Sequence, residues 1–291
     1  MTDTHPVEMS TPAAPRPVTP STILAEVVRD MRERLEGIDG LDRSILASAA
    51  RAEALAAGLD PYLDLCTTAE SAALADLALR TAHRDWDANP SSIPEVRLEQ
   101  EMLSGHVEGQ ALKFLVFACA ARRVLEIGMF TGYSALAMAE ELGEAGEVVA
   151  CEIDADVATF ARECFDRSPV GRRITIEVGP AGETLRRLDD RCRAGDVAPF
   201  DFVFIDADKP GYLGYLDLLL EGSLLAPRAL IAVDNTLLQG EPYAAGTTAS
   251  VNGAAMATFN AALTYDDRVE QVVLPLRDGL TLIRRVPDRA R

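Results

Sequence analysis

Apolar residues recur three or four positions apart through the first third of the chain, with charged residues between them. This spacing predicts an amphipathic helix from Ser21 to Gly37. Two Ala-rich helices are predicted over Ser44–Ala57 and Thr68–Thr81, each opening on a residue that can cap it, and another over Val107–Ala120. The chain is therefore expected to start with helices before any strand appears.

Beyond Arg123 the pattern changes to short β-rich runs that alternate with helical segments. Strands are predicted at Val124–Ile127, Val148–Ile153, Ile174–Val178, Phe202–Asp206 and Leu230–Asp234. Such alternation is typical of crossovers that build a parallel sheet covered on both faces. Two final strands, Val269–Leu274 and Leu280–Arg284, are joined by the turn-forming Arg277, Asp278 and Gly279. We therefore expect an α/β fold with a mostly parallel seven-stranded sheet and an antiparallel final hairpin.

The chain is expected to divide into three parts. Residues 1–20 carry five prolines among Thr, Ser and Ala and gain too little burial to offset chain entropy, so we expect a disordered tail there. Residues 21–105 form a predicted helical segment that packs on the core or on a dimer partner. Residues 106–291 form the predicted ligand-binding core.

The formal charge of −18 disfavours nucleic acid and membrane surfaces as partners and leaves a small molecule as the expected one. The five cysteines are an odd number without CxxC spacing, as expected of a reduced, cytoplasmic protein. The chain shows neither a basic start followed by an apolar stretch nor a run of about 18 apolar residues. We therefore expect neither export nor a membrane span.

A glycine-rich turn, Gly128 to Gly132, follows the first predicted strand, where ligands of open parallel sheets bind. Glycine lets the backbone approach a ligand, and the following helix offers free N–H groups. Three residues separate the two glycines, whereas a dinucleotide site more often reads GxGxxG, so the spacing argues against a nicotinamide cofactor. By itself, an ordinary strand-to-helix turn explains the pattern equally well.

An acidic residue at the end of the second strand adds to this signal. Glu152 follows the glycine-rich turn at about the twenty-residue distance expected of an acid that binds ribose hydroxyls. A solvated acid at a strand end is the alternative, and it would be preferred if the turn were absent. Together the two features favour a nucleoside-binding site.

Oxygen-bearing side chains follow the fourth and fifth strands. Asp206 ends one strand, Asp234 and Asn235 follow the next, and adjacent crossovers would bring all three together. Such a set suits a hard cation, Mg²⁺ before Ca²⁺ or Mn²⁺, rather than a structural zinc ion. Without a cation the acids would repel one another. The alternatives are that they cap helices or turns and that the nearby Lys209 is an ordinary surface ammonium.

In this combination and order, the motifs resemble those of the cation-dependent caffeoyl-CoA and catechol type O-methyltransferases. The resemblance spans roughly Pro61 to Arg285. It is carried by LEIGMFTGYSALAMA at 125–139, ACEID at 150–154, VGPA at 178–181, FDFVFIDADKPGYLGY at 200–215, VDNTLLQG at 233–240 and VEQVVLPLRDGLTLIRR at 269–285. It implies a Rossmann-like class I methyltransferase fold with S-adenosylmethionine as cofactor.

The resemblance also assigns the site. The residues that it places around the cofactor are Ser104, Glu126, Gly128, Ser134, Glu152, Ala181 and Asp206, and those that it places on the metal are Asp206, Asp234 and Asn235. We expect Lys209, three residues after a metal ligand, to act as general base with a pKa lowered by the cation. Asp208 and Gln239 would then face the substrate, whose two adjacent hydroxyls would chelate the ion.

A finer resemblance points to the O-methyltransferases of mycosporine biosynthesis. It is carried by RPVTP at 16–20, LAAGLDPYLDLCTTAES at 55–71 and LEQEMLSGHVEGQALK at 98–113. Those enzymes methylate demethyl-4-deoxygadusol, a cyclic enediol, to 4-deoxygadusol. The chain departs from plant members in lacking a counterpart of their basic N-terminal residue towards coenzyme A, and it also lacks the later glutamate that hydrogen-bonds catechols. A catechol or a caffeoyl-CoA thioester is the alternative substrate.

Two other functions compete with methyl transfer. A nucleotide-dependent oxidoreductase is disfavoured by the glycine spacing, and a non-catalytic cofactor-binding module is disfavoured by the complete metal set. The helices from Ser21 to Thr81 present more apolar surface than a monomer needs, so we expect the homodimer that is usual in the family. Segment 236–252 is either a loop over the substrate or a plain surface connection.

Overall fold

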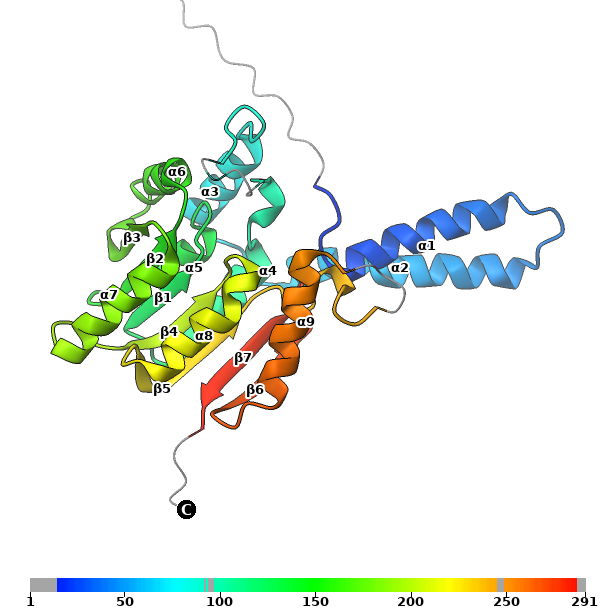
Figure 1. Cartoon of the computed structure of the whole chain (residues 1–291). Helices are drawn as coiled ribbons and strands as arrows, with labels where there is room; N and C mark the ends of the chain where they lie inside the picture. Colours follow the sequence, from blue (N-terminus) through cyan, green and yellow to red (C-terminus); the bar gives the residue numbers. More distant parts are fainter. Residues whose placement is uncertain (1–14, 92, 94–96, 245–248, 287–291) are drawn as a thin grey trace, which may run out of the picture.

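A seven-stranded sheet lies at the centre of the computed structural model, which describes residues 15–91, 93, 97–244 and 249–286 (Figure 1). The strand order is β3-β2-β1-β4-β5-β7-β6. The strands are β1 (Arg123–Ile127), β2 (Glu147–Glu152), β3 (Ile174–Val178), β4 (Phe200–Ile205), β5 (Leu225–Val233), β6 (Val269–Leu274) and β7 (Leu280–Arg285). The first five pair in parallel, and β7 pairs antiparallel with both β5 and β6. The predicted fold class is confirmed.

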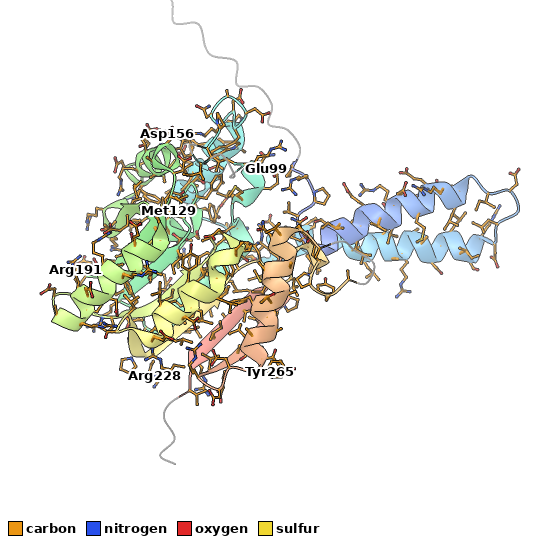
Figure 2. All side chains as sticks on the ribbon, viewed as in Figure 1. Glu99, Met129, Asp156, Arg191, Arg228 and Tyr265 are labelled. Atoms are coloured by element: carbon orange, nitrogen blue, oxygen red, sulfur yellow. The ribbon has the colours of Figure 1, made fainter. Side chains whose placement is uncertain are left out.

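Helices cover both faces of the sheet because apolar side chains point to both faces along each strand. Val124 belongs to the core on one face and its neighbour Leu125 to the core on the other. The first face is covered by α4 (His106–Ala118), α5 (Tyr133–Glu141) and α6 (Ala155–Phe165), and the second by α7 (Ala181–Ala194), α8 (Tyr212–Glu221) and α9 (Val251–Thr264) (Figure 1). Figure 2 shows the resulting contrast between Met129, buried beside the sheet, and Tyr265, exposed after α9.

The N-terminal helices divide into two groups. Helices α1 (Pro20–Glu36) and α2 (Arg43–Cys66) pack side by side and project away from the sheet (Figure 1). Helix α3 (Ala72–His83) instead joins the core through Leu74 and Leu77. No described helix is long and apolar enough to span a membrane. Short 3-10 helices are η1 (Gln100–Met102), η2 (Gly171–Arg173), η3 (Lys209–Gly211) and η4 (Leu238–Gly240).

Three predicted boundaries are wrong, two because a tertiary contact outweighs the local pattern and one because a later residue caps the helix. Helix α2 continues past Ala57 and through Pro61, and Asp60 beside this proline accepts hydrogen bonds from the hydroxyls of Thr19 and Ser21 at the start of α1. Helix α3 begins later than Thr68 because Ser71 caps it, accepting from the N–H of Leu74. Strand β5 begins at Leu225 despite its proline and arginine, since that residue pairs with β4 before an irregularity in the register.

The predicted tail over residues 1–20 falls partly outside the described residues, which start at residue 15. Within the described part, the backbone N–H of Arg16 donates to Glu101 Oε1 at 3.0 Å and its guanidinium donates to Glu99. Thr19 is buried as the capping residue of α1. This stretch is therefore held against the segment that precedes α4.

Candidate active site

The carboxyl ends of β1, β4 and β5 meet at one edge of the sheet. The N–H of Asp206 donates to the carbonyl of Ile127 at 2.8 Å, and that of Asp234 donates to the carbonyl of Ile205 at 2.9 Å. Gly128 has φ +86°, and a Cβ atom there would lie 2.1 Å from the carbonyl oxygen of Asp206. Glycine is therefore required at 128 by the close approach of two strand ends, a reason that is independent of any ligand.

Lys209 lies between the side chains that the sequence assigns to a metal. Its Nζ donates to Asp206 Oδ1 at 3.0 Å, to Asn235 Oδ1 at 2.7 Å and to the hydroxyl of Tyr212 at 2.7 Å. Two of the three predicted ligand residues thus direct an oxygen at one positive charge. Lys209 is not a surface ammonium, since only 11% of its side chain is exposed.

The third predicted ligand, Asp234, is buried beside them. Burial, and then the nearby charge of Asp206, raise the pKa of Asp234 to about 7, while Lys209 opposes the shift. Glu108 in the first turn of α4 is also buried and interacts with Asp234, and burial followed by that neighbour raises the pKa of Glu108 well above its usual value. Arg277 is the counter-charge to Glu108, with Nε 3.5 Å from its Oε2. Acidic side chains are therefore crowded at this edge, and burial and their mutual repulsion favour their protonated forms.

The residues fit a divalent cation. Two carboxylates and an amide supply the oxygen donors that Mg²⁺ prefers. The ammonium group of Lys209 already contacts the oxygens of Asp206 and Asn235. Within the described part of the chain, no group of three or more His, Cys, Asp or Glu side chains is arranged to hold a metal ion. The candidate set differs from such a group because its third member is the amide of Asn235.

Among the side chains of this protein alone, the pKa of Lys209 is raised. Burial alone would lower it, but the hydroxyl of Tyr212 and the carboxylates of Asp206 and Asp234 outweigh burial, and the net shift is upward. The side chains of this protein by themselves therefore keep Lys209 protonated. A role as general base requires another positive charge to engage those carboxylates.

A second polar cluster lies between β1 and α5. Ser134 donates from Oγ to Glu126 Oε1, and both residues are buried. Glu126 Oε2 is buried without a hydrogen-bond partner. Burial is the largest cause that raises the pKa of Glu126 well above its ordinary value. An unpartnered carboxylate oxygen in this position fits a ligand that brings an N–H group or a positive charge.

Glu152 is held in place by two backbone donors. Its Oε2 accepts from the N–H of Phe130 in the glycine-rich turn at 2.8 Å, and its Oε1 accepts from the N–H of Asp154 at 2.9 Å. Phe130 stacks on Trp86, with ring centroids 5.0 Å apart. The glycine-rich turn and the acid that ends β2 are thus one unit, as a nucleoside site requires, and Glu152 is not a solvated acid.

The remaining predicted residues are spread around the two clusters. Ser104 is buried just before Gly105, the residue that caps α4, and Ala181 is the first residue of α7. Asp208 is exposed and accepts a hydrogen bond from the hydroxyl of Tyr215, so its carboxylate takes no part in the Lys209 cluster. Gln239 has an exposed side chain, and its backbone N–H donates to Asp278 Oδ1 at 2.6 Å.

Sequence reasoning missed several polar residues of this edge. They are the buried Glu108, Tyr212 and Asp278 and the half-buried Arg277. Arg277 and Asp278 were read only as turn formers, and Glu108 lies on a helix far from the strand motifs along the chain. The available signal was the placement of charged residues in a hairpin turn next to the carboxyl end of β5.

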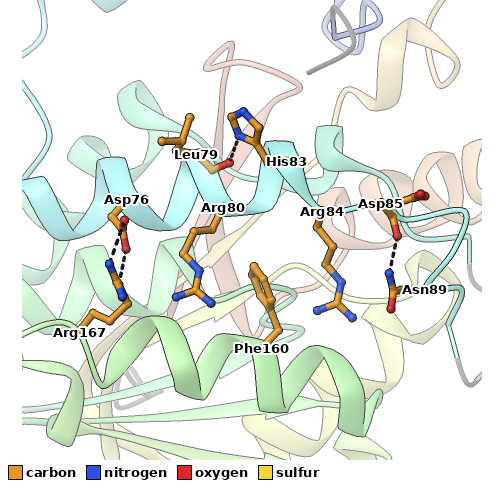
Figure 3. A pocket seen from close by; sticks show the side chains of 9 residues that line it. All are labelled: Asp76, Leu79, Arg80, His83, Arg84, Asp85, Asn89, Phe160 and Arg167. Atoms are coloured by element: carbon orange, nitrogen blue, oxygen red, sulfur yellow. Dashed lines mark hydrogen bonds and ion pairs between the residues drawn. The ribbon is translucent and has the colours of Figure 1, made fainter. Parts of the chain in front are cut away.

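A cavity of about 500 Å³ lies away from these clusters, between α3 and α6 (Figure 3). Its walls carry three arginines, of which Arg80 pairs with Glu163 and Arg167 pairs with Asp76. None of the predicted site residues lines it. Its His83 is hydrogen-bonded to the carbonyl of Leu79 and its Asp76 is paired with Arg167, so the chemistry is assigned to the strand ends instead.

Comparison with known proteins agrees with this geometry. A family model described as O-methyltransferase matches residues 92–286, more than half of the chain. The chain belongs to this O-methyltransferase family. As a family member it is an enzyme, and the oxidoreductase and non-catalytic alternatives are set aside.

Named relatives of this O-methyltransferase include plant and animal proteins. Caffeoyl-CoA O-methyltransferase 2 of Zea mays is 40% identical over 185 residues, which cover 62% of this chain and 68% of the plant protein. Catechol O-methyltransferase domain-containing protein 1 of Mus musculus is 35% identical over 182 residues, covering 62% and 66%. The crystal structure of a SAH-bound methyltransferase from Podospora anserina is similar with a TM-score of 0.67 and 29% identity, covering 81% of this chain and 97% of that one. This O-methyltransferase is thus of the caffeoyl-CoA and catechol type.

Proposed function

We propose that this O-methyltransferase transfers the methyl group of S-adenosylmethionine to one hydroxyl of a vicinal enediol or catechol-like small molecule, with a divalent cation, Mg²⁺ before Ca²⁺ or Mn²⁺. The observation that carries the proposal is the convergence of Asp206 Oδ1 and Asn235 Oδ1 on one positive charge, Lys209 Nζ, beside the buried Asp234. A family member that gathers oxygen donors at its strand ends has the means to hold both a cation and an acceptor diol.

Asp206, Asp234 and Asn235 would hold the cation. When bound, it supplies a Lewis acid that lowers the pKa of an acceptor hydroxyl and fixes its direction. The chain contributes the oxygen donors, of which Asp234 is buried, and keeps them in place through backbone hydrogen bonds between strand ends. Positioning of this kind is the main requirement of methyl transfer, since the attacking oxygen must be aligned behind the methyl carbon.

The methyl donor would lie beside the carboxyl ends of β1 and β2. The proposed contacts are Ser104, Glu126, Gly128, Ser134, Glu152, Ala181 and Asp206. S-adenosylmethionine supplies an electrophilic methyl group on sulfur. Glu126 Oε2 is a buried hydrogen-bond acceptor for S-adenosylmethionine. Glu152, oriented by two backbone N–H groups, is a hydrogen-bond acceptor for its ribose hydroxyls. The SAH-bound Podospora structure supports this choice of donor.

Lys209 is the proposed general base and Asp206 its catalytic partner. The proton of the acceptor hydroxyl would pass to Nζ, which lies within hydrogen-bond distance of both Asp206 and Asn235. Tyr212 steadies the same nitrogen and donates to the carbonyl of Asp234 at 3.3 Å. Asp208 and Gln239 remain proposed substrate contacts, which would require the Asp208 side chain to leave Tyr215.

Within this class of acceptors we propose demethyl-4-deoxygadusol, converted to 4-deoxygadusol in mycosporine biosynthesis. The support is the resemblance of residues 16–20, 55–71 and 98–113 to enzymes of that pathway, together with the formal charge of −18, which disfavours a polyanionic thioester. Catechol and caffeoyl-CoA are the alternative acceptors, in line with the names of the relatives.

We further propose a cytoplasmic homodimer. Apolar side chains stay exposed on α1 and α2, among them Val27 (60% exposed) and Leu55 (69% exposed), on the two helices that project from the sheet. The five cysteines are free, as in a reducing compartment. Sedimentation or light scattering of the full chain tests the dimer, which a monomer at micromolar concentration would exclude.

The deciding experiment offers the purified protein isotopically labelled S-adenosylmethionine, Mg²⁺ and separate acceptors: an enediol, a catechol and a coenzyme A thioester. We expect a labelled methyl ether on the enediol that disappears in excess chelator. Methylation of the catechol or thioester alone would reassign the acceptor. Full activity in chelator would refute the cation.

A further inference from the structure

The turn between β6 and β7 reaches into the proposed cation site. Its Asp278 is buried, with 6% of the residue exposed. Asp278 Oδ1 accepts from the N–H of Gln239 at 2.6 Å, and its Oδ2 accepts from Nδ2 of Asn235 at 3.5 Å. A residue of the C-terminal hairpin therefore contacts a proposed cation ligand and the loop that follows it.

This loop has an unfavourable backbone that the turn holds in place. Asn235, Leu238 and Gln239 have φ values of 58°, 34° and 56°, which residues other than glycine rarely adopt. The N–H groups of Thr236 and Leu237 donate to the carbonyls of Gly279 and Asp278 at 3.0 and 2.9 Å. Together with the Asp278 side chain, these hydrogen bonds stabilise a loop conformation that would otherwise be unfavourable.

The amide of Asn235 has only one orientation that satisfies both of its neighbours. A carboxylate accepts hydrogen bonds and an ammonium donates them. The NH₂ group of Asn235 must therefore face Asp278, and its Oδ1 must face Lys209, as observed. Asp278 thereby selects which atom of Asn235 points at the proposed cation.

We propose that Asp278 is a positioning residue that presents Asn235 Oδ1 to the cation and fixes the loop at 235–239. This inference rests on the proposed cation site. Asp278 acts through Asn235 and through the loop backbone, not by contact with substrate. Partners of this kind are worth about 10- to 100-fold in metal affinity in other metal sites.

The first test concerns the loop alone and needs no metal. Hydrogen–deuterium exchange of the full chain in chelator should show faster exchange across 235–240 in Asp278→Ala than in the unchanged protein. The exposed Asp267, at the other end of β6, provides Asp267→Ala as a control that leaves exchange in this loop unchanged. Equal protection of the loop in Asp278→Ala would overturn its role in fixing the loop.

The second test measures Mn²⁺ affinity by electron paramagnetic resonance, without methyl donor or acceptor. In Asp278→Asn, the side-chain oxygen still accepts from Gln239, so its NH₂ group faces that of Asn235 and favours the wrong amide orientation. We expect a loss of about tenfold or more in Mn²⁺ affinity. Asp267→Asn makes the same change of charge on the surface and should bind Mn²⁺ as the unchanged protein does.

The decisive comparison repeats Asp278→Asn in an Asn235→Asp background. There the new amide donates to a carboxylate, so the substitution should cost less than about twofold or improve affinity. The same loss in both backgrounds would show that Asp278 acts through charge or fold alone and would overturn the proposal. Absence of Mn²⁺ binding by the unchanged protein would instead refute the proposed cation site, and the exchange experiment would still judge the loop.

Discussion

The Nζ atom of Lys209 lies 2.7 Å from Oδ1 of Asn235, a residue that we propose as a cation ligand. The same nitrogen lies 3.0 Å from Asp206 Oδ1. The ammonium and a divalent cation therefore compete for the same oxygen atoms. Binding of the cation would remove what now stabilises the charged form of Lys209, which links cation binding to the availability of a base.

Replacing Lys209 separates these two roles. Lys209→Met should lower kcat by about 10²-fold, within the range of a lost general base. It should not weaken Mn²⁺ binding, because a competing positive charge is removed. Lys113→Met is the matched control, since Lys113 pairs with Glu140 on the neighbouring helix. An unchanged kcat would assign the proton to water or to another group.

Asp234→Ala should abolish turnover while S-adenosylmethionine binding, measured by calorimetry, stays within about twofold of the unchanged protein. The reason is that Asp234 belongs to the proposed cation set and not to the donor contacts. Asp217→Ala, which removes an exposed partner of Arg268, serves as control. A large loss of donor affinity together with retained turnover would contradict this division of the site.

Glu126→Gln should weaken S-adenosylmethionine binding by about tenfold, the loss expected when a charge-assisted hydrogen bond becomes a neutral one. The thermal unfolding temperature of the donor-free protein should not fall, because burial already disfavours the charged form of Glu126. Glu177→Gln changes a partly exposed acid on β3 and should affect neither quantity. Unchanged donor affinity in Glu126→Gln would remove this residue from the donor site.

Stability without divalent ions should fall as pH rises from about 4 to about 7. Burial, the largest cause, raises the pKa of Asp278 to about 6, and burial with Asp206 raises the pKa of Asp234 to about 7. Both groups bind protons more tightly in the folded state than in the unfolded state. Their contribution to the free energy of unfolding is therefore complete at pH values below the unfolded-state pKa and is lost as pH rises through the folded-state pKa. Thermal melts in chelator measure the slope, and Asp234→Asn should flatten its upper part. A melting temperature that rises throughout this range would refute the sign.

Arg277→Met should destabilise the protein increasingly as pH rises above neutrality, because it removes a basic group that opposes the raised pKa of the buried Glu108. Adding Glu108→Gln in the same chain should recover most of this loss, as measured by denaturant unfolding. If the double variant were as unstable as the two single losses combined, the ion pair would not be the source of the effect.

Much of this protein could be predicted from the sequence because the relevant information is local. Alternating short strands and helices predict a parallel sheet, and the chemistry of such a sheet gathers where its strands end. Asp206, Asp234 and Asn235 directly follow their strands, so their meeting follows from topology alone. Glu152 is predicted in the same way and Glu126 from the family resemblance, although only the fold shows that Glu126 keeps a buried oxygen without a partner and that Glu152 is held by the turn.

Only the tertiary structure decided what surrounds these residues. Glu108 comes from a helix before the first strand and Arg277 and Asp278 from the last hairpin, and spacing along a chain carries no information on which distant segments pack together. The upward shift in the pKa of Lys209 likewise depends on the hydroxyl of Tyr212 and on the carboxylates of Asp206 and Asp234, which outweigh burial. Local hydrophobic and polar order thus determined the sheet and its reactive edge, whereas long-range packing decided the charge state and the orientation of the groups on that edge.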